Sequence, residues 1–402
     1  MGQTRRIAIV GAGPIGLEAA LFARQSGYKV TVFERGTIAA NVKAWGHVRL
    51  FSPFGMNVSP WTRNALEQAG HVLPAEDDLL TGREFAERYL IPLSELPELA
   101  GCVHEQTEVR AIGRDGRLKQ DHIGDHARKQ TPFLLLVHHE QYEKVAQADC
   151  VLDCSGTYPN HNWLGSGGIP CPNEREFLTQ KNYQLPDIWG EDRNRFAGRV
   201  TLVAGAGYSA ATSIVAIAEL AESVPGTKAI WLTRAEGEFP ITPIPGDTLP
   251  ERERLARQAN QLALASESSI HWRPDRVVNS IYRGTDQRLH VTIYDQQWQI
   301  EKVVADEILA QVGYRPDHSI YEELQVHECY ASQGPMKLAA ALLGKTSADC
   351  LGQTSHGPES LKNPEPAFFI LGSKSYGRNS RFLLKIGIEQ IREVFSLISG
   401  QI

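Results

Sequence analysis

The stretch RIAIVGAGPIGLEAALFARQSGYKVTVFER at residues 6–35 decides the fold of this chain. Its first apolar run, Ile7 to Val10, is too short for a helix and rich in β-branched residues, which predicts a buried parallel strand. Three glycines follow with the spacing G-x-G-x-x-G, and a helix is expected from about Pro14 to Ser26. A second strand is expected from Tyr28 to Phe33. The order of strand, glycine loop, helix and strand predicts a Rossmann-like βαβ unit.

Each glycine of this loop has its own physical role. Gly11 permits the tight turn, Gly13 lets the backbone approach a pyrophosphate, and Gly16 lets the helix pack closely on the strand. The N–H groups of the helix that begins at Pro14 point at the phosphates. Glu34 ends the second strand, where a carboxylate can accept hydrogen bonds from ribose hydroxyls. Because all these parts agree, the alternative of a glycine-rich turn without a ligand is disfavoured.

The overall composition excludes several classes of protein. The chain has 402 residues, enough for two or three domains, and a formal net charge of −6. Its basic residues form no run, so neither nucleic acid nor an acidic membrane surface is an expected partner. It has no run of about 18 apolar residues, so no membrane span is expected. The first strand begins so near the start that no signal peptide is expected either, which favours a cytoplasmic protein.

The six cysteines do not form a recognisable redox or metal motif. None pairs as C-x-x-C, and their spacing fits no zinc site, so no bound metal is expected. Cys150 and Cys154 are expected on one face of a strand, too far apart for easy bridging. Free thiols in a reducing compartment are therefore the expected state.

An irregular aromatic segment follows Glu34 and extends from Trp45 to Trp61. Its prolines and glycines break any regular period. A segment of this kind, with residues such as Trp45, Arg49 and Asn57, is typical either of a cofactor pocket or of a packed surface cover.

Further strands are expected at 103–112, 133–138 and 148–154, after a helix capped by Thr81. The last of these strands runs into Ser155-Gly156-Thr157. A strand that ends in a small residue and glycine lets the backbone come close to a bound cofactor.

A second unit then repeats the opening pattern. Gly205 and Gly207 take the places of the first two glycines, and Ala210 replaces the third, which is an accepted variant. After the helix, a strand from Lys228 to Thr233 ends in Arg234 instead of an acid. A cation there suits a ribose 2′-phosphate and favours NADP over NAD. The other open interpretation is an ordinary exposed arginine.

The remainder of the chain predicts a β-meander and a return to the first domain. The meander strands are expected near 277–282, 289–294 and 300–304, and a buried strand from Asp306 breaks at Gly313.

One more strand, glycine loop and helix close the chain. The strand is expected at 368–371 and the helix from about Ser380. The polar loop between them, with Lys374 and Arg378, could approach a cofactor.

The two complete nucleotide-binding starts, with the second inserted inside the first domain, resemble the two-dinucleotide-binding-domain flavoproteins. The resemblance covers essentially the whole chain. It implies an α/β fold with two Rossmann-like dinucleotide-binding domains and β-meanders. The FAD-binding domain is expected to be discontinuous, at 1–190 and 306–402, with the NAD(P)H-binding domain inserted at 191–305.

The resemblance also implies which residues bind the cofactors. In the first domain the expected residues are Gly11, Gly13, Pro14, Ile15, Gly16, Glu34, Arg35, Trp45, Arg49, Val109, Ser155, Gly156 and Thr157. In the second glycine loop and the strand after it they are Gly205, Gly207, Tyr208, Ser209, Ala210 and Arg234. At the return crossing and in the final loop they are Gly313, Tyr314, Gly372, Ser373 and Arg378.

Within this superfamily, the disulfide reductases carry a redox cysteine pair after the first helix or in the second domain. Neither 41–57 nor 195–305 contains a cysteine here, so disulfide exchange is not expected. The flavin-containing monooxygenases and the ornithine or lysine N-hydroxylases lack the usual closing Gly-Asp, which is Gly372-Ser373 here, and share the pattern G-x-G-x-S-A. In the monooxygenases an asparagine follows an aromatic loop beside the flavin. Asn57 best matches that catalytic position, with an asparagine that caps a turn as the alternative.

The resemblance implies an FAD-dependent oxidoreductase driven by NADPH. The expected reaction inserts oxygen from dioxygen into a nitrogen or sulfur of a small molecule through a flavin C4a-hydroperoxide. Two alternatives stay open: an NAD(P)H:acceptor reductase of the quinone or ferredoxin type, and a non-catalytic flavin- or nucleotide-binding regulator. The sequence is silent on the substrate and leaves the oligomeric state open, with a homodimer as one option.

Overall fold

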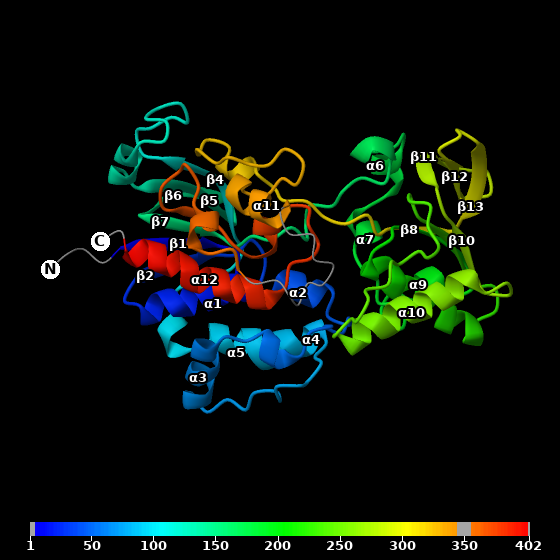
Figure 1. The fold of residues 1–402 in the computed structure, drawn as a ribbon, viewed down its shortest axis with the longest axis horizontal. Helices are drawn as coiled ribbons and strands as arrows, with labels where there is room; N and C mark the ends of the chain where they lie inside the picture. The colour runs from blue at the N-terminus through cyan, green and yellow to red at the C-terminus, as the bar shows by residue number, and fades with distance from the viewer. Residues whose placement is uncertain (1–4, 344–354, 401–402) are drawn as a thin grey trace. The chain divides into compact units, whose positions relative to one another are not determined.

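The computed structural model describes residues 5–343 and 355–400, and the chain forms two compact units. Unit 1 consists of Met1–Asn160 and Arg315–Ile402, and unit 2 of His161–Tyr314 (Figure 1). Unit 2 is therefore inserted into unit 1, which is the arrangement that the two glycine loops predict. None of the helices in the described ranges is long and apolar enough to cross a membrane.

Unit 1 is built on a parallel sheet with the strand order β15-β7-β1-β2-β3. β1 is central, and its residues pair in register with β2 on one side and β7 on the other. The five strands are β1 (Arg6–Val10), β2 (Lys29–Phe33), β3 (Val103–His104), β7 (Cys150–Asp153) and β15 (Phe368–Ile370). All of β7 and β15 is buried, as expected for strands covered on both faces.

Helices and an antiparallel meander accompany this sheet. The helices α1 (Pro14–Gln25) and α12 (Leu384–Ser399) pack against each other, and the meander β4-β5-β6 forms a separate sheet (Figure 1). The meander strands are β4 (Thr107–Arg114), β5 (Phe133–His139) and β6 (Tyr142–Ala148).

The shorter helices of unit 1 lie in the connections. They are α2 (Ala40–Ala44), α3 (Pro60–Gln68), α4 (Gly82–Phe85), α5 (Ile91–Ser94) and α11 (Met336–Leu343), and a π-helical segment (Ala86–Leu90) joins α4 to α5. The predicted capping box is confirmed, because Thr81 and Glu84 exchange side chain to backbone hydrogen bonds at the start of α4.

Unit 2 repeats the same plan around a parallel sheet with the order β10-β9-β8-β14. Its strands are β8 (Val200–Ala204), β9 (Lys228–Leu232), β10 (Ile270–Arg273) and β14 (Glu307–Ala310). α9 (Tyr208–Ser223) packs on β8 and β9, and α10 (Pro250–Leu264) packs on α9. The predicted meander is confirmed as β11 (Val277–Arg283), β12 (Leu289–Tyr294) and β13 (Ile300–Ala305). Three short helices precede the sheet: α6 (Glu174–Phe177), α7 (Gln180–Tyr183) and α8 (Arg193–Phe196).

The predicted domain boundaries, after residues 190 and 305, both fall inside unit 2. The segment that starts at His161 belongs there because buried polar contacts tie it to the sheet of unit 2. Asn182 donates hydrogen bonds to the Glu307 carboxylate at 2.8 Å and to the Ile308 carbonyl at 2.9 Å. Gln311 donates to the carbonyl of Gln184 at 2.9 Å. Such hydrogen bonds join residues that are far apart in the sequence, so no local sequence pattern predicts them.

Two predicted strands are each divided between two sheets. The strand expected at 103–112 breaks at Gln106, whose φ of +50° turns the chain from β3 of the parallel sheet into β4 of the meander. The strand expected at 148–154 changes sheet at Asp149, whose carboxylate accepts two hydrogen bonds of 2.8 Å from Arg6. The last helix begins at Leu384 instead of about Ser380, because Leu383 is still extended.

A buried ionic cluster closes one part of the core of unit 1. Glu365 accepts hydrogen bonds from Arg114 at 2.8 Å and from Arg128 at 2.8 Å, and all three residues are almost completely buried. The guanidinium of Arg114 also lies 3.5 Å from the ring centre of Phe133. One carboxylate thus faces two cations, and backbone carbonyls such as that of Thr131, at 2.6 Å from Arg114, take further N–H groups.

We expect Glu365→Ala to lower the apparent free energy of urea unfolding by about 3–5 kcal/mol, because two buried guanidinium groups lose their anion. The matched control is Glu359→Ala, which removes an exposed carboxylate paired with Lys362 and should leave the unfolding midpoint unchanged. Equal midpoints for the two variants would contradict the structural role of the cluster.

Candidate functional site

The glycine loop after β1 is shaped by two close backbone contacts. Gly11 has a φ of +99°, and a Cβ there would lie 2.8 Å from the carbonyl oxygen of Cys154. A Cβ on Gly16 would overlap the carbonyl oxygen of Gly11. The N–H of Gly11 donates to the carbonyl of Phe33 at 2.8 Å, which ties the loop to the end of β2. The tight turn and the close helix packing predicted for Gly11 and Gly16 are therefore present.

Gly13 differs from these two glycines because it faces open space. No heavy atom of the described chain lies within 4 Å of a Cβ built on it. It precedes α1, whose first residue is Pro14, and no side chain among the described residues caps that helix. Backbone N–H groups at an uncapped helix start, next to open space, form a cradle suited to an anion.

The acid at the end of β2 closes the loop from the other side. Glu34 accepts a hydrogen bond from the N–H of Ala12 at 2.7 Å and another from Gly36 at 2.7 Å. Its side chain therefore lies beside the glycine loop, where the sequence places it, with lone pairs left for hydroxyl donors. Arg35 is exposed and lies 3.9 Å from the carboxylate of Glu108.

At the neighbouring strand ends, a buried ion pair joins two loops. Lys374 donates to the carboxylate of Asp153 at 2.6 Å and lies 3.0 Å from the hydroxyl of Ser155. Both charged side chains are about 1% exposed or less. Gly156 has a φ of +70°, and a Cβ there would lie 3.6 Å from the hydroxyl oxygen of Ser373. The segment 155–157 and the Gly372-Ser373 turn are thus brought together.

The sequence places Lys374 in a polar loop and does not predict its burial, because its partner Asp153 is distant in the chain. Ile15 lies beneath the Gly372-Ser373 turn, since a Cβ on Gly372 would lie 3.3 Å from its side chain. Arg378 is held farther along the same loop by Gln333, which accepts its Nε–H at 2.8 Å.

Asn57 is buried, and its amide is used inside its own loop. Its nitrogen donates to the carbonyls of Ser52 and Pro53 at 3.1 Å each, and its oxygen accepts from the Ser52 hydroxyl at 2.9 Å. These hydrogen bonds are the ones expected of an asparagine that caps a turn, which is the alternative to a catalytic role. The catalytic role of Asn57 stays a prediction.

The other predicted residues of this region have structural contacts of their own. Trp45 packs under Gly82, where an added Cβ would lie 2.6 Å from the indole ring. Arg49 is exposed and donates to the carbonyl of Leu79 at 2.5 Å. Val109 is buried in the meander and pairs with Val137. A cofactor contact for these three residues stays a prediction.

A buried carboxylate on α1 anchors the aromatic segment. Glu18 accepts hydrogen bonds from the N–H and hydroxyl of Ser59, at 3.1 and 2.6 Å, from the hydroxyl of Thr62 at 2.5 Å, and from the hydroxyl of Tyr89. Burial raises the pKa of Glu18, and these hydrogen bonds oppose the shift. Because Glu18 lies on the helix that forms the cradle, it fixes the segment around Asn57 relative to the glycine loop.

The second glycine loop has the same design in unit 2. Gly205 has a φ of +142°, and a Cβ there would overlap the carbonyl oxygen of Gln311. Its N–H donates to the carbonyl of Leu232 at 3.0 Å, as Gly11 does to Phe33. Gly207 again faces open space, with no heavy atom of the described residues within 4 Å of an added Cβ.

The helix α9 follows at once, so its first residues Tyr208 and Ser209 present the start of an uncapped helix, as far as the described chain shows. Ala210, which replaces the third glycine, is fully buried within unit 2.

Arginines gather at the carboxyl end of this sheet. Arg234 follows β9 and is exposed, and β10 ends at Arg273 beside Leu232. The backbone N–H of Arg276 donates to the carbonyl of Thr233 at 3.0 Å. The backbone of Arg276 therefore lies beside the residue that precedes Arg234. Sequence reasoning identified Arg234 alone, because Arg273 and Arg276 come from a different strand and the loop after it.

The return crossing is defined by hydrogen bonds within unit 2. Gly313 has a φ of +83°, and its carbonyl accepts the N–H of Asn162 at 2.9 Å. The hydroxyl of Tyr314 donates to the carbonyl of Tyr183 at 2.9 Å. Both residues therefore bind the end of unit 2 to its first segment. A cofactor contact for them stays a prediction.

The cysteines within the described ranges are unpaired as thiols, with no disulfide among Cys102, Cys150, Cys154, Cys171 and Cys329. Burial raises the pKa of Cys150 to about 12 and that of Cys154 further still, so neither thiol is a ready nucleophile. Hydrogen bonds from Ser332 lower the pKa of Cys329, the one thiol with the opposite shift among those described. No group of three His, Cys, Asp or Glu in the described chain is arranged to hold a metal ion.

Comparison with known proteins supports the fold. The family model described as pyridine nucleotide-disulphide oxidoreductase matches residues 6–40, which include the first glycine loop. No curated protein matches the sequence significantly.

Solved structures match over the whole length. The bacillithiol disulfide reductase Bdr (YpdA) from Bacillus cereus superposes with a TM-score of 0.69 at 19% identity, covering 100% of both chains. The ornithine N-hydroxylase from Kutzneria sp. 744 has a TM-score of 0.66 at 16% identity, covering 99% of this chain and 100% of its own. A flavin-containing monooxygenase from Stenotrophomonas maltophilia has a TM-score of 0.60 at 16% identity, covering 100% and 99%. The chain thus has the fold of the two-dinucleotide-binding-domain flavoproteins, as its sequence predicts.

The raised pKa of Glu18 makes stability depend on pH in a testable direction. A carboxyl whose pKa is higher in the folded state stabilises the fold fully below its unfolded pKa and loses that contribution as the pH rises through the folded pKa. We therefore expect the wild type to lose stability relative to Glu18→Gln in urea unfolding as the pH rises above the ordinary pKa of a glutamate carboxyl. Glu67→Gln, which changes an exposed carboxylate at the end of α3, should follow the wild type at every pH. A constant difference between wild type and Glu18→Gln would contradict the assignment.

Proposed function

We propose that this chain is an FAD-dependent oxidoreductase that is reduced by NADPH. The observation that carries this proposal is the repeated cradle, in which the second glycine of each loop, Gly13 or Gly207, faces open space before an uncapped helix in the described chain. Two such cradles in separate units suit two dinucleotides better than one. The matched family model and the flavoenzymes of similar fold support the same proposal.

The residues of unit 1 suit FAD. Gly13 and the start of α1 would hold the pyrophosphate, and Glu34 would accept from the adenosine ribose. The segment 155–157 would approach the cofactor through its backbone, with its position set by the ion pair of Asp153 and Lys374. When bound, FAD would supply hydride acceptance and electron transfer, which no side chain of the protein can supply.

The residues of unit 2 suit NADPH. Gly207 and the start of α9 would hold the pyrophosphate, while Arg234 would place a cation near the ribose 2′-phosphate. Arg273 and Arg276 face the carboxylates of Glu301 and Asp295 instead. The second strand is followed by the acid Glu34 in unit 1, whereas in unit 2 it is followed, after Thr233, by Arg234. That difference in charge favours NADPH over NADH at the second cradle.

More narrowly, we propose a monooxygenase that uses dioxygen to oxidise a nitrogen or sulfur atom of a small molecule. The described cysteines offer no redox pair, which argues against the disulfide chemistry of Bdr despite its similar fold. Ornithine N-hydroxylase and flavin-containing monooxygenase share the fold as well. The loop around Asn57, whose residues 52–59 carry no charged side chain, would help to exclude water from the flavin.

The acceptor reductase and the non-catalytic regulator remain the alternatives to this narrower proposal.

The two cradles can be tested separately with Gly13→Val and Gly207→Val. Both positions have backbone angles that any residue adopts, and neither Cβ meets a described atom within 4 Å, so both variants should fold normally. Gly13→Val should weaken FAD binding about 100-fold or more, because its side chain fills the space of the pyrophosphate. Gly207→Val should retain FAD and raise the KM for NADPH.

Fluorescence titration with FAD, flavin bleaching by NADPH and circular dichroism check these outcomes. Loss of FAD from both variants, or from neither, would count against the assignment of one dinucleotide to each cradle.

The narrower proposal is tested with isotopically labelled dioxygen and three probes: L-ornithine, cadaverine and methyl phenyl sulfide. A monooxygenase should place one labelled oxygen atom in at least one product while NADPH is consumed, as mass spectrometry would show. Anaerobic reduction of a quinone at a comparable rate, without label in any probe, would identify the acceptor reductase instead. Failure of NADPH to bleach the bound flavin would identify the regulator.

A further inference from the structure

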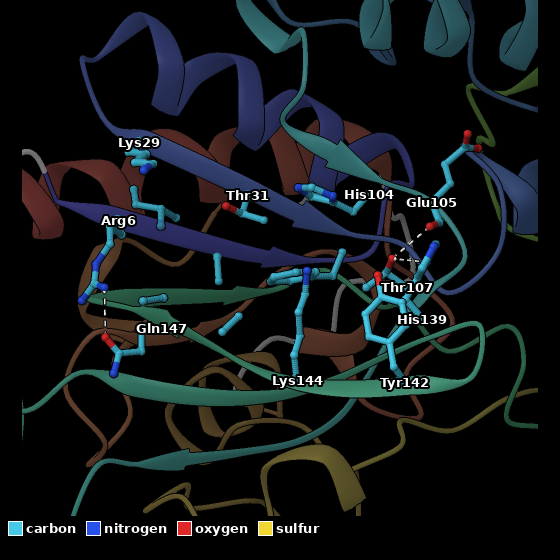
Figure 2. Close-up of a pocket in the computed structure, with 15 residues that line it drawn as sticks. Arg6, Lys29, Thr31, His104, Glu105, Thr107, His139, Tyr142, Lys144 and Gln147 are labelled. Carbon is cyan, nitrogen blue, oxygen red and sulfur yellow. Dashed lines mark hydrogen bonds between the residues drawn. The ribbon is translucent and has the colours of Figure 1, made fainter.

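A pocket of about 450 Å³ lies in unit 1, apart from the glycine loop. It lies between the face of the parallel sheet formed by β1 and β2 and the meander strand β6 (Figure 2). The glycine loop lies beyond the carboxyl ends of those strands, whereas this pocket follows their length, from Arg6 and Lys29 to Phe33. The mechanism proposed above makes no use of it.

The register of the strands explains why the pocket exists. Ala8 pairs with Thr31 across β1 and β2, so small side chains occupy the middle of this face. Opposite them, β6 also contributes small side chains, Ala146 and Ala148. Larger side chains at these four positions would close the space. A pocket of this volume is of the size that binds small organic ligands.

Cations dominate the charge of the pocket. Lys144 projects from β6 toward the parallel sheet, and Lys29 lies near one end (Figure 2). Neither lysine has a salt bridge in the part of the chain that the structure describes. Arg6, by contrast, is engaged by Asp149 at 2.8 Å. The single acid of the lining, Glu105, already accepts the N–H of Ile38 at 2.6 Å.

The opposite end of the pocket is aromatic. His104 stacks on Phe33 with ring centres 6.0 Å apart, and Tyr142 meets His139 edge to face at 5.6 Å. Burial lowers the pKa of His104, and the charges of Lys144 and His139 act in the same direction. His104 therefore presents an uncharged, flat ring. Flat rings beside unpaired ammonium groups suit a ligand that is planar at one end and anionic at the other.

We propose that this pocket binds a small aryl anion, with its aromatic ring near His104 and Tyr142 and its acidic group directed to Lys144 and Lys29. A carboxylate, a sulfonate or a phosphate would serve equally, so an aromatic acid and a nucleoside monophosphate share the required chemistry. The site is independent of the proposed oxidoreductase activity, because it uses neither glycine loop.

The test is calorimetric titration of the FAD-saturated protein with two probes, naphthoate and adenosine monophosphate. At least one should bind, and the stronger probe identifies which source of aryl anion the pocket prefers. Adenosine and cyclohexanecarboxylate, which lack the charge and the ring respectively, should bind at least about tenfold more weakly. Affinity should fall as salt is added, because the lysines are near the surface.

Two variants locate the site. Lys144→Glu should weaken binding about tenfold or more, and Ala146→Phe should abolish it by filling the pocket. The matched control is Lys302→Glu, an exposed lysine on the equivalent kind of strand, β13, in unit 2. All three variants should retain FAD.

Absence of binding by both probes would overturn the proposal, as would binding that Lys144→Glu and Ala146→Phe leave unchanged. Binding that is seen only with FAD-free protein and is lost on saturation with FAD would also overturn it, since the pocket would then belong to the dinucleotide cradle.

Discussion

The contact between α1 and the turn after β1 constrains the rest of unit 1. A side chain on Gly16 would overlap the carbonyl of Gly11, so the helix can rest on the strand only with a glycine there. This close approach brings the start of α1 beside Gly13 and leaves its N–H groups facing open space. In unit 2 the close contact is instead between Gly205 and the backbone of Gln311, and the third position is Ala210. The space beside the second glycine, Gly207, is open as in unit 1.

Buried polar side chains hold the surrounding loops to this contact. Glu18 lies on α1 itself and gathers donors from Ser59, Thr62 and Tyr89, which fixes the aromatic segment. The pair of Asp153 and Lys374 joins the ends of β7 and β15 in the same way. Each carboxylate is costly to bury unless its donors stay in place, so these contacts favour one arrangement of loops over looser ones.

The sequence predicts the features that depend on neighbours in the chain. Both glycine loops, the capping box at Thr81 and the meander of unit 2 follow from local spacing, and the structure confirms them. Lys374 shows the limit of this approach, because its partner Asp153 is 221 residues away and nothing near the lysine indicates burial. The sequence does not predict the turn at Gln106 either, because a residue other than glycine in the left-handed region leaves no sign in the hydrophobic pattern. The catalytic role of Asn57 depends on a cofactor contact, which loop composition alone does not determine.

The two units differ in a charge that, under the proposed function, would separate two similar ligands. Their loops offer an anion the same backbone groups, so pyrophosphate alone cannot distinguish them. The difference arises one strand later, where unit 1 has Glu34 held by Ala12 and Gly36, and unit 2 has the exposed Arg234. A 2′-phosphate next to Glu34 would bring two negatively charged groups together, whereas beside Arg234 it would gain charge-assisted hydrogen bonds. Under the proposed function, repulsion in unit 1 and attraction in unit 2 would together direct NADPH to unit 2 more completely than attraction alone.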